Sequence, residues 1–197
     1  MKEKCYIRDS KSHPVLGRSL GVVFLCMATY NKRENSDRRK RKMSIESVKA
    51  YLKQYDMEER IREFDVSSAT VELAAEALNC EAQRIAKTLS FLQGDKAVLI
   101  CTAGDAKVDN HKYKERFGMK AKMLSFEEVE EMTGHVVGGV CPFAVKEGVP
   151  VYLDVSLQRF ETVYPACGSA NSAIELTIPE LEKCSEYEAW VDVCKGY

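Results

Sequence analysis

Histidine is scarce in this sequence, with 3 among 197 residues, and none of the 8 cysteines forms a Cys-x-x-Cys pair. The histidines are scattered, so neither residue type shows the spacing of a zinc or other metal site. Cys80 and Cys101 fall in apolar surroundings, where a free cysteine behaves as a small hydrophobe. We therefore expect reduced thiols in a cytosolic protein, with no bound metal and no other cofactor.

Long apolar runs are also missing. The apolar stretch Gly21–Ala28 is far shorter than the about 20 residues that span a bilayer. It does not suit a signal peptide either, because a strongly basic segment follows it and no small-residue cleavage site is evident. We expect no membrane partner. The 45% hydrophobic and 30% charged content is ordinary for a globular protein of one domain, with or without an appendage.

The first 42 residues differ in charge from the rest of the chain. Residues 1–42 hold 12 Lys/Arg and 4 Asp/Glu, a net charge of +8, so residues 43–197 carry −9 of the total of −1. A basic nucleic-acid tail is one interpretation. We prefer another, in which residues 1–42 are a non-domain extension, read in frame from upstream sequence, and Met43 is the natural start. The run Arg38–Lys42 is what purine-rich codons ahead of a start codon encode. Residues 43–197 then form the domain.

Regular helix and strand patterns begin at Ser44. Ser44 is expected to cap the first helix, Ser125 opens a capping box, and Gln93–Lys96 is a hairpin signal between two strands. The expected helices cover residues 44–55, 70–78, 109–117, 125–132 and a stretch from 177; the expected strands cover 61–66, 85–92, 97–102, 151–153, 162–164 and 173–176; 188–193 is either a last strand or the end of the last helix. Helices and hairpins do not alternate strictly, which favours an α+β fold with a mixed sheet.

A glycine-rich loop follows the helix pattern at 125–132. The segment Thr133–Phe143 holds three glycines, a histidine and a proline, so it cannot be regular helix or strand. The Gly138-Gly139 pair leaves two N–H groups uncovered by side chains, free to face a ligand oxygen. A plain connecting loop is the commoner interpretation of such a segment.

Two further segments accompany this loop. Arg84–Phe91 lies upstream and Gly168–Leu176 downstream, and Thr70–Leu78 and Gly104–Asp109 complete an ordered set of five. Taken together, these segments resemble the YbaK/prolyl-tRNA synthetase-associated editing family, from about Ser44 to Val193. Members hydrolyse mischarged aminoacyl-tRNA. The resemblance implies a mixed, partly barrel-like β-sheet surrounded by helices, and a pocket for the 3′-terminal aminoacyl-adenosine.

The resemblance also implies the site residues. The family's lysine falls on Lys87, and its loop on Gly138–Pro142. We expect Lys87 to hold a substrate oxygen or phosphate, and N–H groups of Gly138 and Gly139 to stabilise the oxyanion, a donor typically contributing roughly 3 kcal/mol. Without the resemblance, Lys87 would be assigned to a solvent-facing strand position. The expected substrate-binding residues are His135, Val140, Cys141, Pro142, Phe143, Gly168, Ser169 and Asn171.

For two residues of that set, His135 and Cys141, more than one role is considered. His135 has a pKa suited to a general base, and a hydrogen bond that orders the loop is an equal alternative. Cys141 lies beside Pro142 with no paired His–Asp pattern evident, so we expect it to pack or shape the pocket rather than act as a nucleophile.

The sequence predicts the type of reaction more specifically than the amino acid that is removed. The free-standing members that act on cysteinyl-tRNA(Pro) carry a serine and an aspartate where this chain has Ala166 and Ala173, and an aromatic residue where it has His135. We therefore expect a trans-editing deacylase for tRNA(Pro) carrying Cys, Ala or another small amino acid. The expected partners are the tRNA acceptor end and a prolyl-tRNA synthetase. The alternatives are a non-catalytic aminoacyl- or nucleotide-binding module and a regulatory partner of a synthetase.

Nucleic-acid binding depends largely on cationic contacts with phosphates, which an acidic domain must supply locally. A cluster of basic residues offers this: Lys107, Lys112, Lys114, Arg116, Lys120 and Lys122. A solvated charged face is the ordinary alternative.

Overall fold

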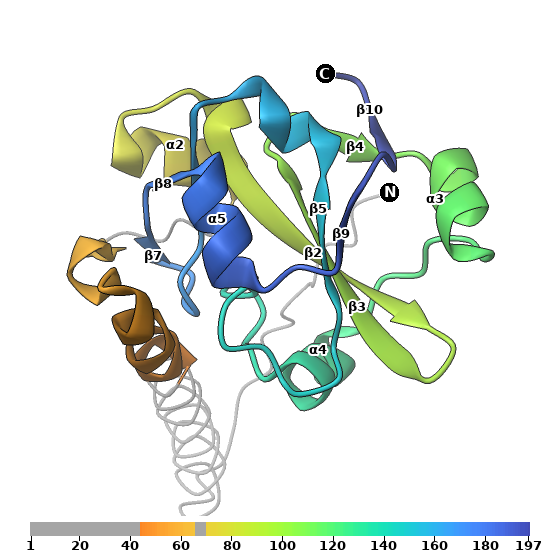
Figure 1. Cartoon of the computed structure of the whole chain (residues 1–197), viewed down its shortest axis with the longest axis horizontal. Helices are drawn as coiled ribbons and strands as arrows, with labels where there is room; N and C mark the ends of the chain where they lie inside the picture. Colours follow the sequence, from red (N-terminus) through yellow and green to blue (C-terminus); the bar gives the residue numbers. More distant parts are fainter. Residues whose placement is uncertain (1–43, 66–69) are drawn as a thin grey trace, which may run out of the picture. The chain divides into compact units, whose positions relative to one another are not determined.

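The computed structural model describes residues 44–65 and 70–197 (Figure 1). The N-terminal extension of residues 1–42 lies outside the described residues, so the boundary at Met43 stays a prediction. No helix within the described ranges is long and apolar enough to cross a membrane.

A six-stranded mixed sheet organises the fold (Figure 1). Its strand order is β8-β6-β2-β3-β5-β9. The strands are β2 (Ile85–Gln93), β3 (Lys96–Ala103), β5 (Val151–Asp154), β6 (Thr162–Pro165), β8 (Leu176–Thr177) and β9 (Ala189–Val191). The pairs β2–β3 and β6–β8 are antiparallel, whereas β2–β6, β3–β5 and β5–β9 are parallel. The expected α+β class with a mixed, partly barrel-like sheet and surrounding helices is confirmed.

The hairpin β2–β3 carries the expected catalytic lysine. Its register runs from Ala86 opposite Ala103 to Gln93 opposite Lys96, and places Lys87 opposite Thr102. Gly94 adopts a φ of +67° in the connecting turn, a conformation that two-residue hairpin turns need and glycine adopts without strain. The sequence signal at residues 93–96 therefore predicted this hairpin correctly.

The helices begin where side-chain caps start them. The described helices are residues 44–52, α2 (Val71–Leu78), α3 (Asn110–Phe117), α4 (Phe126–Thr133) and α5 (Ile178–Ser185), with short 3-10 turns η1 (Lys53–Tyr55), η2 (Glu58–Arg60), η3 (Ala82–Arg84) and η4 (Val155–Arg159). Thr70, Asp109, Ser125 and Thr177 accept N–H groups of the first turns of α2 to α5, and Ser125 and Thr177 belong to complete capping boxes. These caps satisfy N–H groups that a helix start leaves unpaired.

Some local expectations differ from the structure. Ser44 is already helical, and its hydroxyl contacts His135 instead of capping the helix. The strand expected at 61–66 is reduced to β1 (Arg62–Glu63), with position 66 outside the described residues; β1 pairs with β7 (Ser172–Ala173). The strand expected at 173–176 is divided between β7 and β8, and the open alternative at 188–193 resolves as β9. A last small ladder pairs β4 (Lys107–Val108) with β10 (Cys194–Lys195).

The main apolar core lies between the sheet and the helices that cover it. Leu52 of the first helix, Leu153 of β5 and Leu181 of α5 are fully buried there. A smaller cluster under α2 includes Leu78, Ile85 and Tyr164, and a third joins β3 to α4. The smaller clusters leave a space between β2, α2 and α4, and the candidate site occupies that space.

Candidate active site

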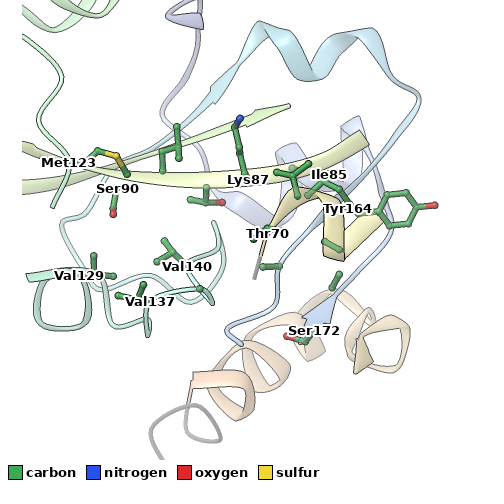
Figure 2. A pocket seen from close by; sticks show the side chains of 18 of the residues that line it. Thr70, Ile85, Lys87, Ser90, Met123, Val129, Val137, Val140, Tyr164 and Ser172 are labelled. Atoms are coloured by element: carbon green, nitrogen blue, oxygen red, sulfur yellow. The ribbon is translucent and has the colours of Figure 1, made fainter. Parts of the chain in front are cut away.

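A pocket of about 470 Å³ runs alongside β2 (Figure 2). Its walls are residues of α2, β2, α4, the loop after α4 and the chain around β6 and β7. Most of the lining is small or apolar: Val71, Ala74, Ile85, Ala86, Leu89, Met123, Leu124, Phe126, Val129, Val137, Val140, Ala166 and Ala173. The polar residues of the lining are Thr70, Lys87, Thr88, Ser90, Tyr164 and Ser172. The volume and the mainly apolar wall are typical of small-molecule sites.

The loop after α4 turns back at its glycine pair. Gly134 ends α4 with a φ of +83°, and Gly139 N–H then donates to the Val136 carbonyl at 2.9 Å. Gly138 stands at the third position of that four-residue turn with a φ of +84°, where a type II turn needs a residue that tolerates positive φ. The turn presents Val137, Gly138 and Val140 to the pocket.

This hydrogen bond corrects one expectation about the glycine pair. The Gly139 N–H is already used within the turn, so it is not a free oxyanion donor. Gly138 lines the pocket, and no hydrogen bond among the described residues occupies its N–H. Of the two expected donors, only Gly138 therefore remains a candidate.

Gly139 has a packing function instead. A Cβ on Gly139 would lie 2.6 Å from the carbonyl carbon and oxygen of Gly168 and 2.7 Å from the Ser169 nitrogen. A Cβ on Gly168 would lie 2.7 Å from the Ser44 carbonyl oxygen. The two glycine-containing loops and the first helix therefore touch through their backbones, which only residues without a side chain allow.

Lys87 contributes to the pocket wall, and its ammonium is held beside the wall. Its Nζ donates to the carbonyl oxygens of Gly104 at 2.9 Å and Ala106 at 2.6 Å, in the turn after β3. Burial lowers the pKa of Lys87 below the ordinary lysine value. In Figure 2 the Lys87 side chain leaves β2 on the side opposite to Ser90 and points away from Val137 and Val140.

His135 lies behind the loop and does not line the pocket. It is 1% exposed, its Nδ1 lies 3.1 Å from Ser44 Oγ, and its Nε2 lies 2.9 Å from the Phe143 carbonyl oxygen. The carbonyl can only accept, so Nε2 carries the proton and Nδ1 accepts from the serine. Burial lowers the pKa of His135, and the Phe143 hydrogen bond offsets part of that shift. Of the two roles left open by the sequence, these contacts favour the loop-ordering one.

Most other expected binding residues form the support of the pocket. Cys141 and Phe143 are fully buried, and burial raises the pKa of the Cys141 thiol to about 12, so this thiol does not provide a thiolate. Ser169 Oγ lies within hydrogen-bond distance of the side chains of Asn171 and Ser172. The Asn171 side chain donates to the Phe64 carbonyl at 2.7 Å.

Only Lys87, Gly138 and Val140 of the expected set therefore line the pocket. The other residues, Gly139, His135, Cys141, Pro142, Phe143, Gly168, Ser169 and Asn171, are absent from its wall. No group of three His, Cys, Asp or Glu side chains suited to a metal ion occurs within residues 44–65 and 70–197.

Comparison with known proteins identifies the family. The model of the aminoacyl-tRNA editing domain matches residues 65–184.

The chain belongs to the aminoacyl-tRNA editing domain family.

Several relatives share this domain. The uncharacterized protein YwhH of Bacillus subtilis (strain 168) is 55% identical over 156 residues, covering 79% of this chain and 99% of that protein. A proline–tRNA ligase of Shouchella clausii (strain KSM-K16) is 35% identical over 101 residues, which are 51% of this chain and 17% of the ligase. This editing domain is thus comparable with a small part of the ligase.

The fold is shared with solved structures. A crystal structure of a candidate trans-editing enzyme for prolyl tRNA synthetase superposes with a TM-score of 0.70 at 28% identity, covering 78% of this chain and 98% of that one. The crystal structure of hypothetical protein APE2540 superposes with a TM-score of 0.64 at 25% identity, covering 74% and 99%.

Ala166 and Ala173, at which the sequence predicts a difference from cysteine-specific members, meet at the pocket. Ala166 and Ala173 form an antiparallel β-bridge, and both line the wall. Each alanine contributes a methyl group to the pocket wall. The wall is therefore apolar at these two positions.

Sequence reasoning missed several lining residues. Ser90 and Thr88 alternate with Leu89 along β2, and Ser172 belongs to the downstream segment. The period of two along a strand could have placed Thr88 and Ser90 on one face. Nothing in the sequence indicated Met123, because it lies in the connection between α3 and α4 and is brought to β2 by a bridge to Phe91.

A polar network closes the end of the pocket at Tyr164. The Tyr164 hydroxyl donates to Glu175 at 2.8 Å, and the Arg84 guanidinium lies 5.0 Å from the Tyr164 ring centroid and 3.4 Å from the Glu175 carboxylate. The Tyr164 hydrogen bond, with those of Thr162 and the charge of Arg84, holds the pKa of Glu175 below its ordinary value. Glu175 is thus an ionised structural partner rather than a proton donor.

The expected basic cluster is partly engaged in structural contacts. Lys112 Nζ lies 2.7 Å from Asp192, and the Arg116 guanidinium lies over the rings of Phe117 and Tyr152. Lys120 and Lys122 are exposed, and they precede the pocket residue Met123.

Proposed function

We propose that this chain hydrolyses the ester bond between a wrongly attached amino acid and the 3′ end of a tRNA. Membership of the editing family and the mainly apolar pocket that contains Lys87 and Gly138 support this function. Such an activity is needed because a synthetase pocket separates amino acids that differ by one methylene by only about 1–3 kcal/mol.

The reaction needs a water, a place for the oxyanion and a route for one proton. The water oxygen attacks the ester carbonyl carbon, the carbon–oxygen bond to the ribose breaks, and the proton from water ends on the ribose oxygen. The Gly138 N–H stabilises the negative carbonyl oxygen that forms between these steps. One such donor typically contributes roughly 3 kcal/mol of transition-state stabilisation.

Lys87 supplies a positioned positive charge. An ammonium has three N–H donors, and the Gly104 and Ala106 carbonyls accept two of them. We assign the third to an oxygen of the terminal ribose or of the ester. The two carbonyl contacts hold the ammonium near the pocket wall before substrate arrives, which lowers the cost of orienting it.

No protein nucleophile is assigned. The Cys141 thiol is buried with a raised pKa, and both ring nitrogens of His135 are in hydrogen bonds. An aminoacyl ester is already activated, so direct attack by water is sufficient once the ester is held and its oxyanion stabilised.

The substrate we propose is tRNA(Pro) carrying a small amino acid, with alanine favoured over cysteine. The methyl groups of Ala166 and Ala173 on the wall offer no hydrogen bond to a thiol or hydroxyl. The similarity to part of a proline–tRNA ligase supports tRNA(Pro) as the carrier and a prolyl-tRNA synthetase as a partner. Action on such a substrate places the protein in the cytoplasm.

The observation that carries the proposal is that Lys87 of β2 and Gly138 of the facing loop line the same pocket, and that no hydrogen bond among the described residues occupies the Gly138 N–H. The test is deacylation of tRNA(Pro) charged with Ala, Cys, Ser or Pro by the full chain, by Lys87→Ala and by Lys87→Arg, with circular dichroism to verify folding. Hydrolysis of a mischarged species that spares Pro and is lost in the folded Lys87→Ala variant is the expected result. No hydrolysis by the folded full chain would contradict the proposal and favour a non-catalytic binding module.

A further inference from the structure

Large exposed apolar side chains gather at one end of the pocket. Phe126 is 75% exposed, Met123 58% and Val137 43%, and all three line the pocket. We call these three residues the apolar rim. An apolar group of this kind beside a cavity marks a surface that is covered when a partner or ligand binds.

The backbone around the rim is firmly held. Ser125 caps α4 through a complete capping box, which fixes Phe126 at the first helical position. Leu124, between Met123 and Ser125, is buried, and its N–H donates to the Ser90 carbonyl at 3.1 Å. The rim side chains are thus presented outward by an anchored segment, so their exposure is built into the fold.

The pocket has two chemically different ends. Figure 2 places Tyr164 and Ser172 at one end of the cavity, and Met123, Val129 and Val137 at the other, along β2. The first end is small, since Ala166 and Ala173 belong to it. The second end is open and carries the rim. Figure 2 shows Lys87 on β2 between the two ends, and Gly138, the second proposed ester-holding group, follows the rim residue Val137 in the facing loop.

We propose that the apolar rim is the seat of the 3′-terminal adenine base, with Phe126 as its stacking face. This inference rests on the proposed function, because an aminoacyl-adenosine whose ester lies near Lys87 and whose amino acid occupies the small end has its base at the open end. Single-stranded bases are bound by stacking on exposed aromatic rings. A planar base is apolar on its faces, which matches Phe126 and Met123.

Positive charge near the apolar rim is also consistent with binding of the terminal adenosine. Lys120 and Lys122 are exposed and lie three and one residues before Met123. The phosphates on the 5′ side of the terminal adenosine need cationic contacts, and these ammonium groups can supply them.

Stacking is tested directly with a fluorescent base. Uncharged tRNA(Pro) carrying 2-aminopurine at its 3′-terminal position is titrated with the full chain, with Phe126→Ala, Phe126→Tyr and Phe126→Leu, and with the control Met119→Ala. Met119 is exposed and apolar but absent from the pocket wall. We expect quenching of the fluorescence by the full chain, Phe126→Tyr and Met119→Ala, and loss of quenching in Phe126→Ala and Phe126→Leu. Quenching that does not depend on Phe126 would overturn the inference.

A kinetic comparison separates this inference from the proposed function. For charged tRNA, Phe126→Ala is expected to lower kcat/KM by about 10- to 100-fold. For the ethyl ester of the same amino acid, which has no base, the variant is expected to equal the full chain. Equal kcat/KM on charged tRNA would overturn the adenine seat while leaving hydrolysis established. Phe126-dependent quenching without hydrolysis of any substrate would support the seat and overturn the proposed function.

The remaining outcome concerns a protein partner. If Phe126→Ala leaves quenching and kcat/KM unchanged but alters the sedimentation coefficient of the chain or its binding to prolyl-tRNA synthetase, the rim is a protein interface and the inference is overturned.

Discussion

Gly139 lies against the backbone of Gly168, so closely that a Cβ on Gly139 would stand 2.6 Å from the Gly168 carbonyl oxygen. The contact joins two loops that are 29 residues apart in the chain. One loop presents Gly138 to the pocket, and the other leads to Ser172 and Ala173 on the same wall. This backbone contact therefore brings together two loops that contribute to the pocket wall.

Gly139→Ala is expected to displace the loop and destabilise the fold by about 1–3 kcal/mol, because overpacking of a backbone contact has no flexible side chain to absorb it. Deacylation should fall with it, since Gly138 moves with the loop. Urea unfolding and kcat/KM measure the two effects. Gly94→Ala is the control for deacylation alone: Gly94 has nothing within 4 Å of its Cβ position, and although its φ of +67° makes an alanine strained there, the folded variant should keep deacylation intact. Equal effects of both variants on deacylation would argue against the contact.

Stability is expected to fall as the pH drops below the ordinary histidine pKa of 6.5, in part through His135. Burial lowers the pKa of His135 in the folded chain. Between the lowered and the ordinary value the unfolded chain binds more protons than the folded one, so the free energy of unfolding decreases as the pH falls through that window. The contribution of His135 to the free energy of unfolding is fully present above that pH window.

The measurement is urea unfolding at several pH values for the full chain and for His135→Gln, whose amide can still donate to the Phe143 carbonyl. The variant should show a weaker pH dependence between pH 7 and pH 5, approximately the range in which histidine titrates. Identical slopes for the two proteins would mean that His135 does not remain neutral in the folded chain.

Deacylation is expected to decline at alkaline pH, and to do so below the ordinary titration range of lysine. Burial lowers the pKa of Lys87, so its ammonium loses the proton that holds the substrate oxygen earlier than an exposed lysine would. The profile of kcat/KM from about neutral pH toward the ordinary lysine pKa of 10.5, corrected for spontaneous hydrolysis, measures this. Lys87→Arg keeps its charge throughout that range and should lack the decline in whatever activity it retains. A decline shared by both proteins would assign it to another group.

Ala166→Ser is expected to shift substrate preference from alanine toward cysteine or serine by about tenfold, because a hydroxyl on the wall can pair with a polar side chain. The ratio of kcat/KM values on tRNA(Pro) charged with each amino acid measures the shift. Ala74→Ser places the same hydroxyl on the α2 side of the pocket and should shift the ratio less. Equal shifts would mean that the Ala166 position does not contact the aminoacyl group.

Charge reversal at Lys120 and Lys122 is expected to weaken tRNA binding about tenfold and to flatten its salt dependence, since phosphate contacts are lost. Hydrolysis of a minimal aminoacyl-adenosine should be unchanged. The double variant Lys53→Glu, Lys183→Glu makes the same change in net charge on other exposed residues. Lys120 and Lys122 test phosphate binding more directly than Lys112 and Lys114, because Lys112 is paired with Asp192. Equal weakening by both double variants would make the effect one of net charge alone.

The elements with strong local signals were predictable from the sequence. Ser125 and Thr177 carry their own capping partners three residues later, and Gly94 marks the hairpin, so the relevant interactions lie within a few residues. Ser44 was misassigned because its partner, His135, is 91 residues away. A pattern of neighbouring residues cannot predict a hydrogen bond between a serine hydroxyl and a histidine ring far away in the chain.

For the site, the sequence determined which residue types are present and, through the ordered segments, the family and the chemistry to expect. The tertiary structure decided which atoms are free to act. The Gly139 N–H is hydrogen-bonded within a turn, and both ring nitrogens of His135 are in hydrogen bonds. The Cys141 thiol is buried in the core. The tertiary structure left Gly138 and Lys87 on the wall. The physical reason is that hydrogen-bond satisfaction and burial depend on neighbours far away in the chain, and only the folded backbone brings these together.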